Sequence, residues 1–274
     1  MRFASVLHDG TPMAVAIEGD QAIPLDGIRE LGAGTPLSLL RDPPLDRSSA
    51  LPASAVHRRA VVPHPGKIIC VGHNYAAHIE ETQRERPDYP VFFAKFPSTL
   101  TGPYDDIPLP PESEAIDYEG ELVVVIGERG RRVPREQALE HVAGYAVAND
   151  ISMRDYQYRT HQFLQGKAWD ASTPVGPDLV MLDEITEPLT LQTFVNGERT
   201  QDTSTDLMVF DVATLVSAVS EFATLEPGDL ILTGTPGGVG YRREPQLLLK
   251  DGDVVVVEVD GVGRIENRCV ADQA

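Results

Sequence analysis

Two glutamates separated by one residue begin an apolar run and have the right spacing to bind a metal ion. Glu119 and Glu121 lie in the segment IDYEGELVVVIG, of which residues 119–126 are expected to form a strand. Alternate side chains of a strand share a face, which would place the two Cα atoms about 6.5 Å apart. Two such carboxylates repel each other unless a proton or a cation intervenes. Ligands that are all oxygen favour Mg2+ or Mn2+ over zinc.

A third carboxylate, Asp150, is a candidate ligand for the same ion. It lies near the end of an expected strand over residues 144–151, where the sequence reads GYAVANDI. The alternative interpretation is a solvated strand end with alternating acids, and the Glu-x-Glu pattern alone does not decide between the two.

A histidine and a glutamate three residues apart could form a general base. His78 and Glu81 fall within an expected helix over residues 74–84, where a spacing of three places them on one face. A carboxylate that fixes one imidazole tautomer prepares the other ring nitrogen to deprotonate water. The alternative is an ordinary pair on a helix surface. His73, in the same segment, is assigned no catalytic role.

Further along the chain, polar and basic residues could grip the oxygens of an acidic substrate. Arg154, Gln157, Arg159 and Lys167 lie within the segments MRDYQYR and GK. Such side chains hydrogen-bond carboxylate and keto oxygens, although some of them could merely offset neighbouring acids. We favour that second role for Arg159.

The glycine-rich segment LTGTPGGVG, residues 232–240, is expected to form a tight loop at an active site. It lacks the Gly-Lys-Ser/Thr ending of a phosphate-binding loop, and its glycines are not spaced as in a dinucleotide site. Backbone N–H groups turned inward would instead line the site near Gly234 and Thr235.

The elements around these residues predict a strand-rich α+β protein of two units. Residues 1–62 read as a small β-rich N-terminal domain, and PHPG at 63–66 marks the boundary to a catalytic domain over 63–274. Asn196-Gly197 and Asp260-Gly261 each separate two expected strands, as in tight hairpins. Helical periodicity over 212–222, with Asp211 as N-cap, predicts one longer helix.

Composition narrows the class of protein. The chain has 274 residues, with 23 basic and 42 acidic side chains and a formal net charge of −19, which disfavours nucleic acid and anionic membranes as partners. Two cysteines, Cys70 and Cys269, are expected to be free buried thiols. We find no signal-peptide pattern and no apolar segment of membrane-spanning length, so a cytoplasmic protein is expected.

Taken in order, these segments resemble the fumarylacetoacetate hydrolase superfamily, in its short bacterial type. The matching pieces cover residues 65–270 and are KIICVGHNYAAHIEE, FFAKFPST, IDYEGELVVVIG, GYAVANDISMRDYQ, GKAWDASTPVGP, VNGE and PGDLILTGTPGGVG. The resemblance implies that Glu119, Glu121 and Asp150 bind the metal. It further implies that His78 and Glu81 activate water. Lys167 would face the substrate, and Gln157 and Thr235 would contact it. Arg154 and Gly234 are further candidate substrate-binding positions, from the residue patterns described above.

The same resemblance implies a fold, a metal and an assembly. The expected body is a rolled, mixed β-sandwich of β-clip-like form beside the small N-terminal domain, and the expected assembly is a homodimer. The metal would be Mg2+, alternatively Mn2+ or Ca2+. His161 stands where the long eukaryotic members carry tyrosine, which argues against their substrate.

The function implied is hydrolysis of a C–C bond in a 2,4-diketo acid such as an acylpyruvate or fumarylpyruvate. The metal would stabilise an enolate, and His78 with Glu81 would activate the attacking water. The alternative is an isomerase of 2-hydroxyhepta-2,4-diene-1,7-dioate type or an oxaloacetate decarboxylase, with a role in degrading aromatic compounds. A non-catalytic keto-acid binder is a further alternative, disfavoured because His78, Glu81 and Lys167 are all present.

Overall fold

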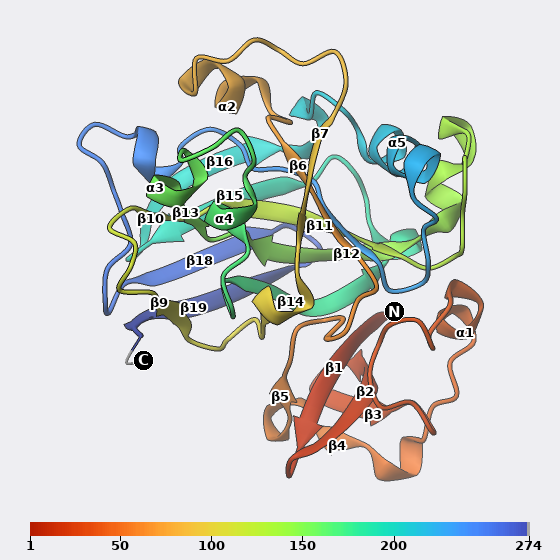
Figure 1. Ribbon diagram of the computed structural model, residues 1–274. Helices are drawn as coiled ribbons and strands as arrows, with labels where there is room; N and C mark the ends of the chain where they lie inside the picture. Colours follow the sequence, from red (N-terminus) through yellow and green to blue (C-terminus); the bar gives the residue numbers. More distant parts are fainter. Residues whose placement is uncertain (273–274) are drawn as a thin grey trace.

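A large mixed β-sheet forms the centre of the molecule. The computed structural model describes residues 1–272. The main path of the sheet runs β4-β3-β2-β1-β14-β12-β11-β17-β6-β7, with β5 on β1 and β8 on β14 (Figure 1). Its strands are β1 (Arg2–His8), β2 (Thr11–Glu18), β3 (Gln21–Pro24), β4 (Leu51–Pro52), β5 (His57–Arg58), β6 (Ile68–Gly72), β7 (Val91–Lys95), β8 (Leu100–Thr101), β11 (Gly120–Ile126), β12 (Val142–Asn149), β14 (Thr173–Met181) and β17 (Leu230–Leu232).

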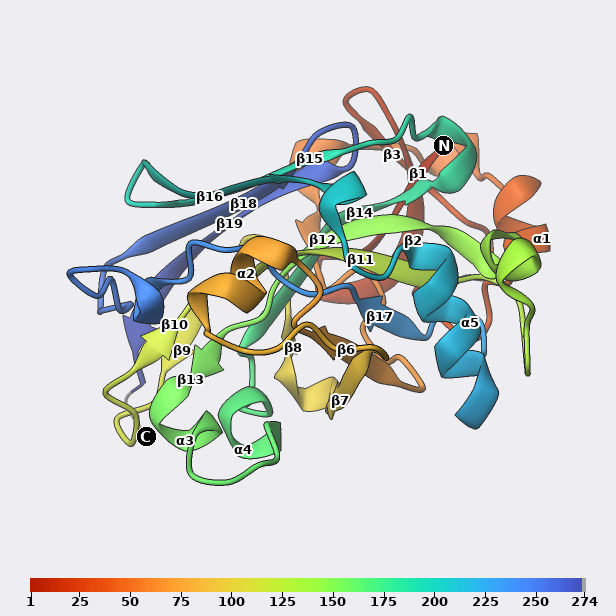
Figure 2. The ribbon, with the colours of Figure 1, turned by 90° about the horizontal axis from the view of Figure 1, so that it is seen from above.

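A second sheet packs against the first, and a short ribbon lies beside them. The second sheet has the order β16-β15-β18-β19-β9, and β10 pairs with β13 (Figure 2). These strands are β9 (Ile107–Leu109), β10 (Ile116–Asp117), β13 (Ser152–Met153), β15 (Thr190–Val195), β16 (Glu198–Ser204), β18 (Val254–Val259) and β19 (Gly263–Ala271). Both predicted hairpins are present, and Asn196 and Gly197 adopt positive φ of 51° and 82° as such a turn requires.

Helices are few and mostly short. The α-helices are α1 (Leu37–Arg41), α2 (Ala76–Glu81), α3 (Arg154–Gln157), α4 (Leu164–Lys167) and α5 (Val212–Phe222). The 3-10 segments are η1 (Arg47–Ser49), η2 (Ala53–Ala55), η3 (Pro97–Thr99), η4 (Arg135–His141), η5 (Leu182–Glu184), η6 (Thr205–Leu207) and η7 (Gly240–Arg242). None of the helices in residues 1–272 has the length and apolar character needed to cross a bilayer. The strand-rich α+β prediction is therefore confirmed.

The longest helix is capped as its sequence predicts. The side chain of Asp211 accepts a hydrogen bond from Thr214 N at 2.9 Å. Leu215 and Val219 of α5 then pack into a core shared with both sheets, where Val124 and Val257 are among the fully buried members. Burial of this face fixes α5 against the sandwich.

Two expected α-helices differ from the structure. The helix expected over residues 134–141 is the 3-10 segment η4 (Arg135–His141), in which Gln137 N donates to Pro134 O at 3.0 Å. The helix expected over 74–84 is reduced to α2, because Gln83 takes a φ of 55° just after it. Before α2, the Asn74 amide donates to Thr233 O at 2.8 Å and to Phe210 O at 3.0 Å. These bonds tie the chain entering α2 to the glycine-rich loop.

The first residues of the chain extend the large sheet. In β1, Arg2 and Phe3 pair with Val180 and Leu179 of β14, and Phe3 joins a core that contains Val123. Figure 1 shows β1 to β5 gathered at one end of the molecule. The division of the chain at residue 62 into two domains stays a prediction.

Candidate metal centre and active site

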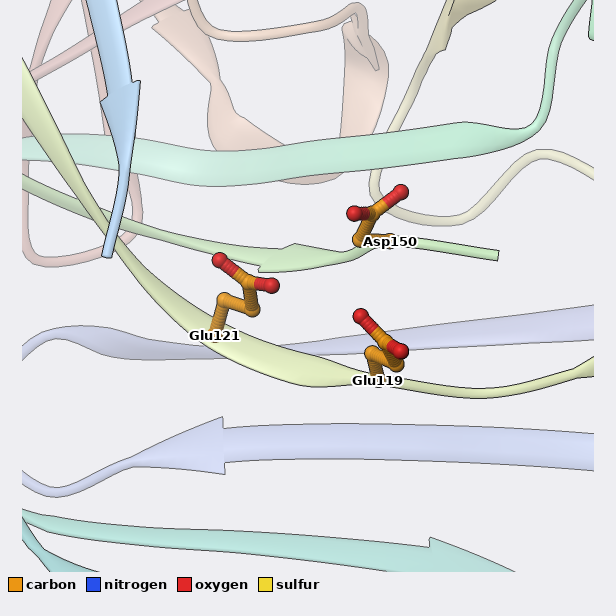
Figure 3. A group of neighbouring side chains, drawn as sticks. All are labelled: Glu119, Glu121 and Asp150. Carbon is orange, nitrogen blue, oxygen red and sulfur yellow. The ribbon is translucent and has the colours of Figure 1, made fainter. Parts of the chain in front are cut away.

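Two neighbouring strands bring three carboxylates together. Gly120 of β11 pairs with Asn149 at the end of β12, and Asp150 N donates to Glu119 O at 2.8 Å. This register places Asp150 beside Glu119 and Glu121, and one carboxylate oxygen from each lies within 4.8 Å of the others. Figure 3 shows the three carboxylates converging on a common space. All three side chains are buried, so the cluster is not the solvated strand end that the sequence left open.

Two lysines neutralise part of this acidic cluster. Lys167 Nζ lies 2.6 Å from Glu119 Oε2 and 2.9 Å from Asp150 Oδ2. Lys95 Nζ, from the end of β7, lies 2.5 Å from the other oxygen of Asp150. Burial alone would lower the pKa of Lys167, but the charges of Asp150 and Glu119 outweigh it and raise that pKa. Lys167 is therefore a protonated, hydrogen-bond-donating group at neutral pH.

Arg154 links the cluster to a fourth buried acid, Asp117. The guanidinium contacts Glu119 Oε1 at 2.7 Å and Asp117 Oδ2 at 2.8 Å. Asp117 also accepts hydrogen bonds from Gly240 N at 2.7 Å and Tyr241 N at 3.1 Å. Arg154 therefore orients Glu119 from one side and anchors the start of η7 through Asp117.

Glu121 is the carboxylate that these cations leave without a partner. Among residues 1–272, no basic side chain lies within 4.0 Å of it, and its Oε2 accepts a 2.7 Å hydrogen bond from Gly234 N. Burial, followed by the charges of Asp150 and Glu119, raises the pKa of Glu121 well above its usual range. Burial acts in the same direction on Glu119, but Lys167 and Arg154 outweigh it and lower the pKa of Glu119.

The residues present fit a bound divalent cation. Four buried carboxylates meet three buried cations, which leaves one negative charge that requires a proton or a cation. The candidate ligand atoms are carboxylate oxygens, which suit a hard ion. Glu119, Glu121 and Asp150, the candidate ligands from the sequence, would hold such an ion.

The His78–Glu81 pair is formed on α2. His78 Nδ1 lies 2.8 Å from Glu81 Oε1, and Glu81 Oε2 accepts from Gly238 N at 2.8 Å. A carboxylate acceptor requires the proton on Nδ1, which leaves the Nε2 lone pair available as a base. The glycine-rich loop thus orients Glu81, and Glu81 orients the imidazole.

His73 supports His78 through its ring. The two imidazoles stack with centroids 5.7 Å apart, and His73 adopts a φ of 56°. Burial, with smaller contributions from His78 and Arg84, lowers the pKa of His73 to about 4. A neutral ring therefore faces His78 at neutral pH.

One cavity is lined by the His78 imidazole and by Glu119, one of the three carboxylates of the metal centre. Its lining includes Glu119, His78, Lys167, Arg154, Gln157 and Thr235. Gln157 Oε1 accepts from Arg154 at 2.9 Å, and Thr235 Oγ1 donates to Gly120 O at 3.0 Å. Gly234 instead directs its N–H to Glu121, so its structural role is to hold a carboxylate. Direct substrate contacts of these positions remain predictions.

Lys95 and Asp117 also belong to this network, although the sequence did not single them out. Lys95 is fully buried at its side chain and stands at the end of a strand, where an unpaired lysine is unfavourable. Asp117 begins the acidic segment that contains Glu119. A buried lysine in an apolar strand was the available signal for Lys95. Arg159, in contrast, lies 3.6 Å over the ring of Tyr156 and outside the metal centre.

Comparison with known proteins assigns the family. Residues 67–270 match the family described as "Fumarylacetoacetate (FAA) hydrolase C-terminal". Among curated relatives, the mitochondrial oxaloacetate tautomerase FAHD2B of Bos taurus is 46% identical over 245 residues, or 88% of this chain and 78% of that protein. The human mitochondrial oxaloacetate tautomerase FAHD2A is 44% identical over the same shares.

Solved structures agree with this assignment over the whole chain. Fumarylacetoacetate hydrolase from Exiguobacterium antarcticum is 37% identical with a TM-score of 0.87, covering 99% of this chain and 100% of its own. The 2-hydroxyhepta-2,4-diene-1,7-dioate isomerase from Mycobacterium marinum is 32% identical with a TM-score of 0.85, covering 100% of both chains. The mixed β-sheet fold implied by the resemblance is therefore confirmed.

The relatives also correct one expectation. The sequence led us to expect a cytoplasmic protein, but the similar oxaloacetate tautomerases from cattle, rat and human are all named mitochondrial. Acidic composition and the lack of a recognised leader pattern carry little information on compartment, so that expectation is withdrawn.

The ordered motifs, the sheet arrangement and the buried carboxylate cluster with its lysines lead to one assignment. This chain is an enzyme that belongs to the fumarylacetoacetate hydrolase family, whose members use divalent metals.

Proposed function

We propose that the protein is a Mg2+-dependent tautomerase of a 2-oxo acid, with oxaloacetate as the first substrate to test. The observation that carries this proposal is the shared cavity, which is lined by Glu119 of the buried carboxylate cluster, by Lys167 and by the His78 imidazole. Relatives at 44–46% identity are named for oxaloacetate tautomerisation, which supports the choice of substrate.

The chemistry divides between the cation site and the side chains. A cation held by Glu119, Glu121 and Asp150 would act as a Lewis acid toward the 2-oxo and carboxylate oxygens. His78 Nε2 would remove or return the proton at C3, since Glu81 keeps the ring proton on Nδ1. Lys167 would counter the negative charge that develops on the 2-oxo oxygen as that proton leaves.

Hydrolysis of a 2,4-diketo acid, the first reading of the sequence, stays a prediction. It needs the same base, which would act on water instead of on the substrate carbon. The named relatives favour the isomerase-type alternative over it. The expected homodimer, the acidic keto-acid ligand and the lack of nucleic-acid or membrane partners are likewise proposals.

A spectroscopic assay tests the proposed activity. Enol-oxaloacetate would be mixed with the protein and Mg2+, and the loss of enol absorbance would be compared with the spontaneous rate. We expect acceleration that EDTA abolishes and Mg2+ restores. His78→Ala should lower the rate by about 10²-fold to 10⁴-fold. Replacing the exposed His64 with alanine should leave the rate unchanged and serves as the control.

Two results would contradict the proposal. Activity on oxaloacetate that survives EDTA would remove the metal from the mechanism. Release of pyruvate from acetylpyruvate, without acceleration of oxaloacetate tautomerisation, would return the assignment to the C–C hydrolase.

A further inference from the structure

The cavity beside the metal centre is locally basic, although the chain carries a net charge of −19. Within residues 1–272, Glu119 is the one acid among its lining residues. The basic residues that line it are Lys167, Arg154, Arg84 and Arg242. Lys167 and Arg154 are buried and already bound to carboxylates, whereas Arg84 and Arg242 are exposed at the mouth. The cavity therefore has basic side chains paired with carboxylates at its inner end, and two guanidinium groups exposed at its mouth.

Arg242 is placed at the mouth by the buried network. It ends η7, whose first two backbone N–H groups, those of Gly240 and Tyr241, donate to Asp117. Its guanidinium lies 5.9 Å from the ring centre of Tyr158 and 5.7 Å from that of Tyr241, and both rings also line the cavity. Within the described chain, no carboxylate lies within 4.0 Å of it, unlike the adjacent Arg243, which binds Glu198 at 2.9 Å.

Arg84 lines the same cavity from a different segment of the chain. It follows α2, the helix that carries His78 and Glu81, and its N–H donates to Ile79 O at 3.1 Å. In residues 1–272 it also has no carboxylate partner within 4.0 Å, and it lines a second cavity of about 310 Å³ that adjoins the first. That second cavity contains no acidic lining residue in the described chain and adds Arg159 and His161.

We infer that Arg84 and Arg242 bind the distal carboxylate of a 2-oxo diacid, the class to which oxaloacetate belongs. This inference rests on the proposed function, because it takes the carboxylate cluster as the site of the 2-oxo acid group. Paired guanidinium groups are the usual receptors for a carboxylate, and their charge would draw dianions toward a site on an acidic protein.

The free space supports recognition at the mouth. The inner cavity measures about 30 Å³, far below the roughly 150 Å³ of a cavity that admits benzene. A four-carbon diacid must therefore displace side chains, and the exposed ones are Arg84, Tyr158 and Arg242. A contact between the distal carboxylate and the arginines would hold these displaced side chains over the bound acid.

Two stable probes separate the distal carboxylate from the 2-oxo acid group. Oxamate carries the oxalyl amide alone, and N-oxalylglycine carries the same group with an added carboxylate. Both would be titrated calorimetrically into the protein with Mg2+ present. We expect N-oxalylglycine to bind at least 10-fold more tightly than oxamate. Arg84→Gln and Arg242→Gln should each weaken N-oxalylglycine about 3-fold to 10-fold and leave oxamate within 2-fold.

Matched controls lie within two positions of each arginine in the sequence. Arg86→Gln and Arg243→Gln remove the same charge from residues that do not line the cavity, and both should leave the two affinities unchanged. Equal affinities for the two probes in the wild type, or equal losses in the control variants, would overturn the distal subsite. Failure of both probes to bind with Mg2+ present would instead overturn the proposed function, and the subsite with it.

Discussion

Replacing Glu121 with glutamine should remove a loss of folding stability that the metal-free protein shows as the pH rises. Four buried carboxylates face three buried cations, and Glu121 is the one without a cationic partner in the described residues. Burial, with Asp150 and Glu119, raises the pKa of Glu121, so the folded state keeps a proton that the unfolded chain has released. Glutamine keeps the size of the side chain and an oxygen that accepts from Gly234 N.

The magnitude follows from the charge count. One extra proton in the folded state lowers the free energy of unfolding by about 1.4 kcal/mol for each pH unit, between the unfolded and folded pKa values of that group. The loss begins above about pH 4.3, the usual pKa of a glutamate in an unfolded chain, and ends at the raised folded pKa. From pH 6 to pH 8 the wild type should lose up to about 2.7 kcal/mol relative to Glu121→Gln.

Urea unfolding in EDTA at pH 6, 7 and 8 measures this difference. The exposed Glu114→Gln removes the same charge at the surface and should follow the wild type. Saturating Mg2+ should remove this additional pH dependence of the unfolding free energy in the wild type, because a bound cation takes the place of the proton. If the wild type and Glu121→Gln lose stability in parallel from pH 6 to pH 8, the assigned proton is not on Glu121.

Three further predictions concern the base, the core and the helix cap. Glu81→Gln should lower kcat about 10-fold to 100-fold, because glutamine fixes the His78 tautomer less firmly than the carboxylate does. The Mg2+ affinity measured by calorimetry should be unchanged, and a loss of that affinity would contradict the role assigned to Glu81. Leu215→Ala should lower the free energy of unfolding, measured by urea titration, by about 2–5 kcal/mol. The control Leu207→Ala should lower it by less than about 0.5 kcal/mol, because Leu207 is 60% exposed. Similar losses in the two variants would refute the placement of α5. Asp211→Ala should cost about 1 kcal/mol by removing the N-cap, and Asp211→Asn should restore most of it; a loss shared equally by both would point to the ion pair with Arg135 instead.

Local sequence signals predicted the strands and hairpins around the site well. The continuous apolar run over residues 122–126 became β11, which is buried on both faces, and both Asx-Gly pairs became turns. The spacing of Glu119 and Glu121 was sufficient to place them on one face. Local spacing could not place Asp150 beside them, because its position depends on the pairing of β11 with β12.

Long-range contacts explain what the sequence did not reveal. Lys95 and Asp150 form an ion pair although they are 55 residues apart in the sequence, and Asp117 accepts a hydrogen bond from η7, which lies more than 120 residues further along the chain. Neither contact has a local pattern in the chain. The helix expected over 74–84 is shorter because Asn74 bonds to Thr233 and Phe210, a tertiary contact that replaces the first helical turn. The basic mouth of the cavity likewise joins Arg84 and Arg242 from segments distant in sequence.

Calorimetric titration of Mn2+ into the metal-free protein measures whether the buried carboxylates bind a cation. We predict one bound Mn2+ per chain, at least 10-fold weaker binding in Glu121→Gln, and unchanged binding in His78→Ala. The absence of stoichiometric binding to the wild type, or equal affinity in Glu121→Gln, would contradict the account.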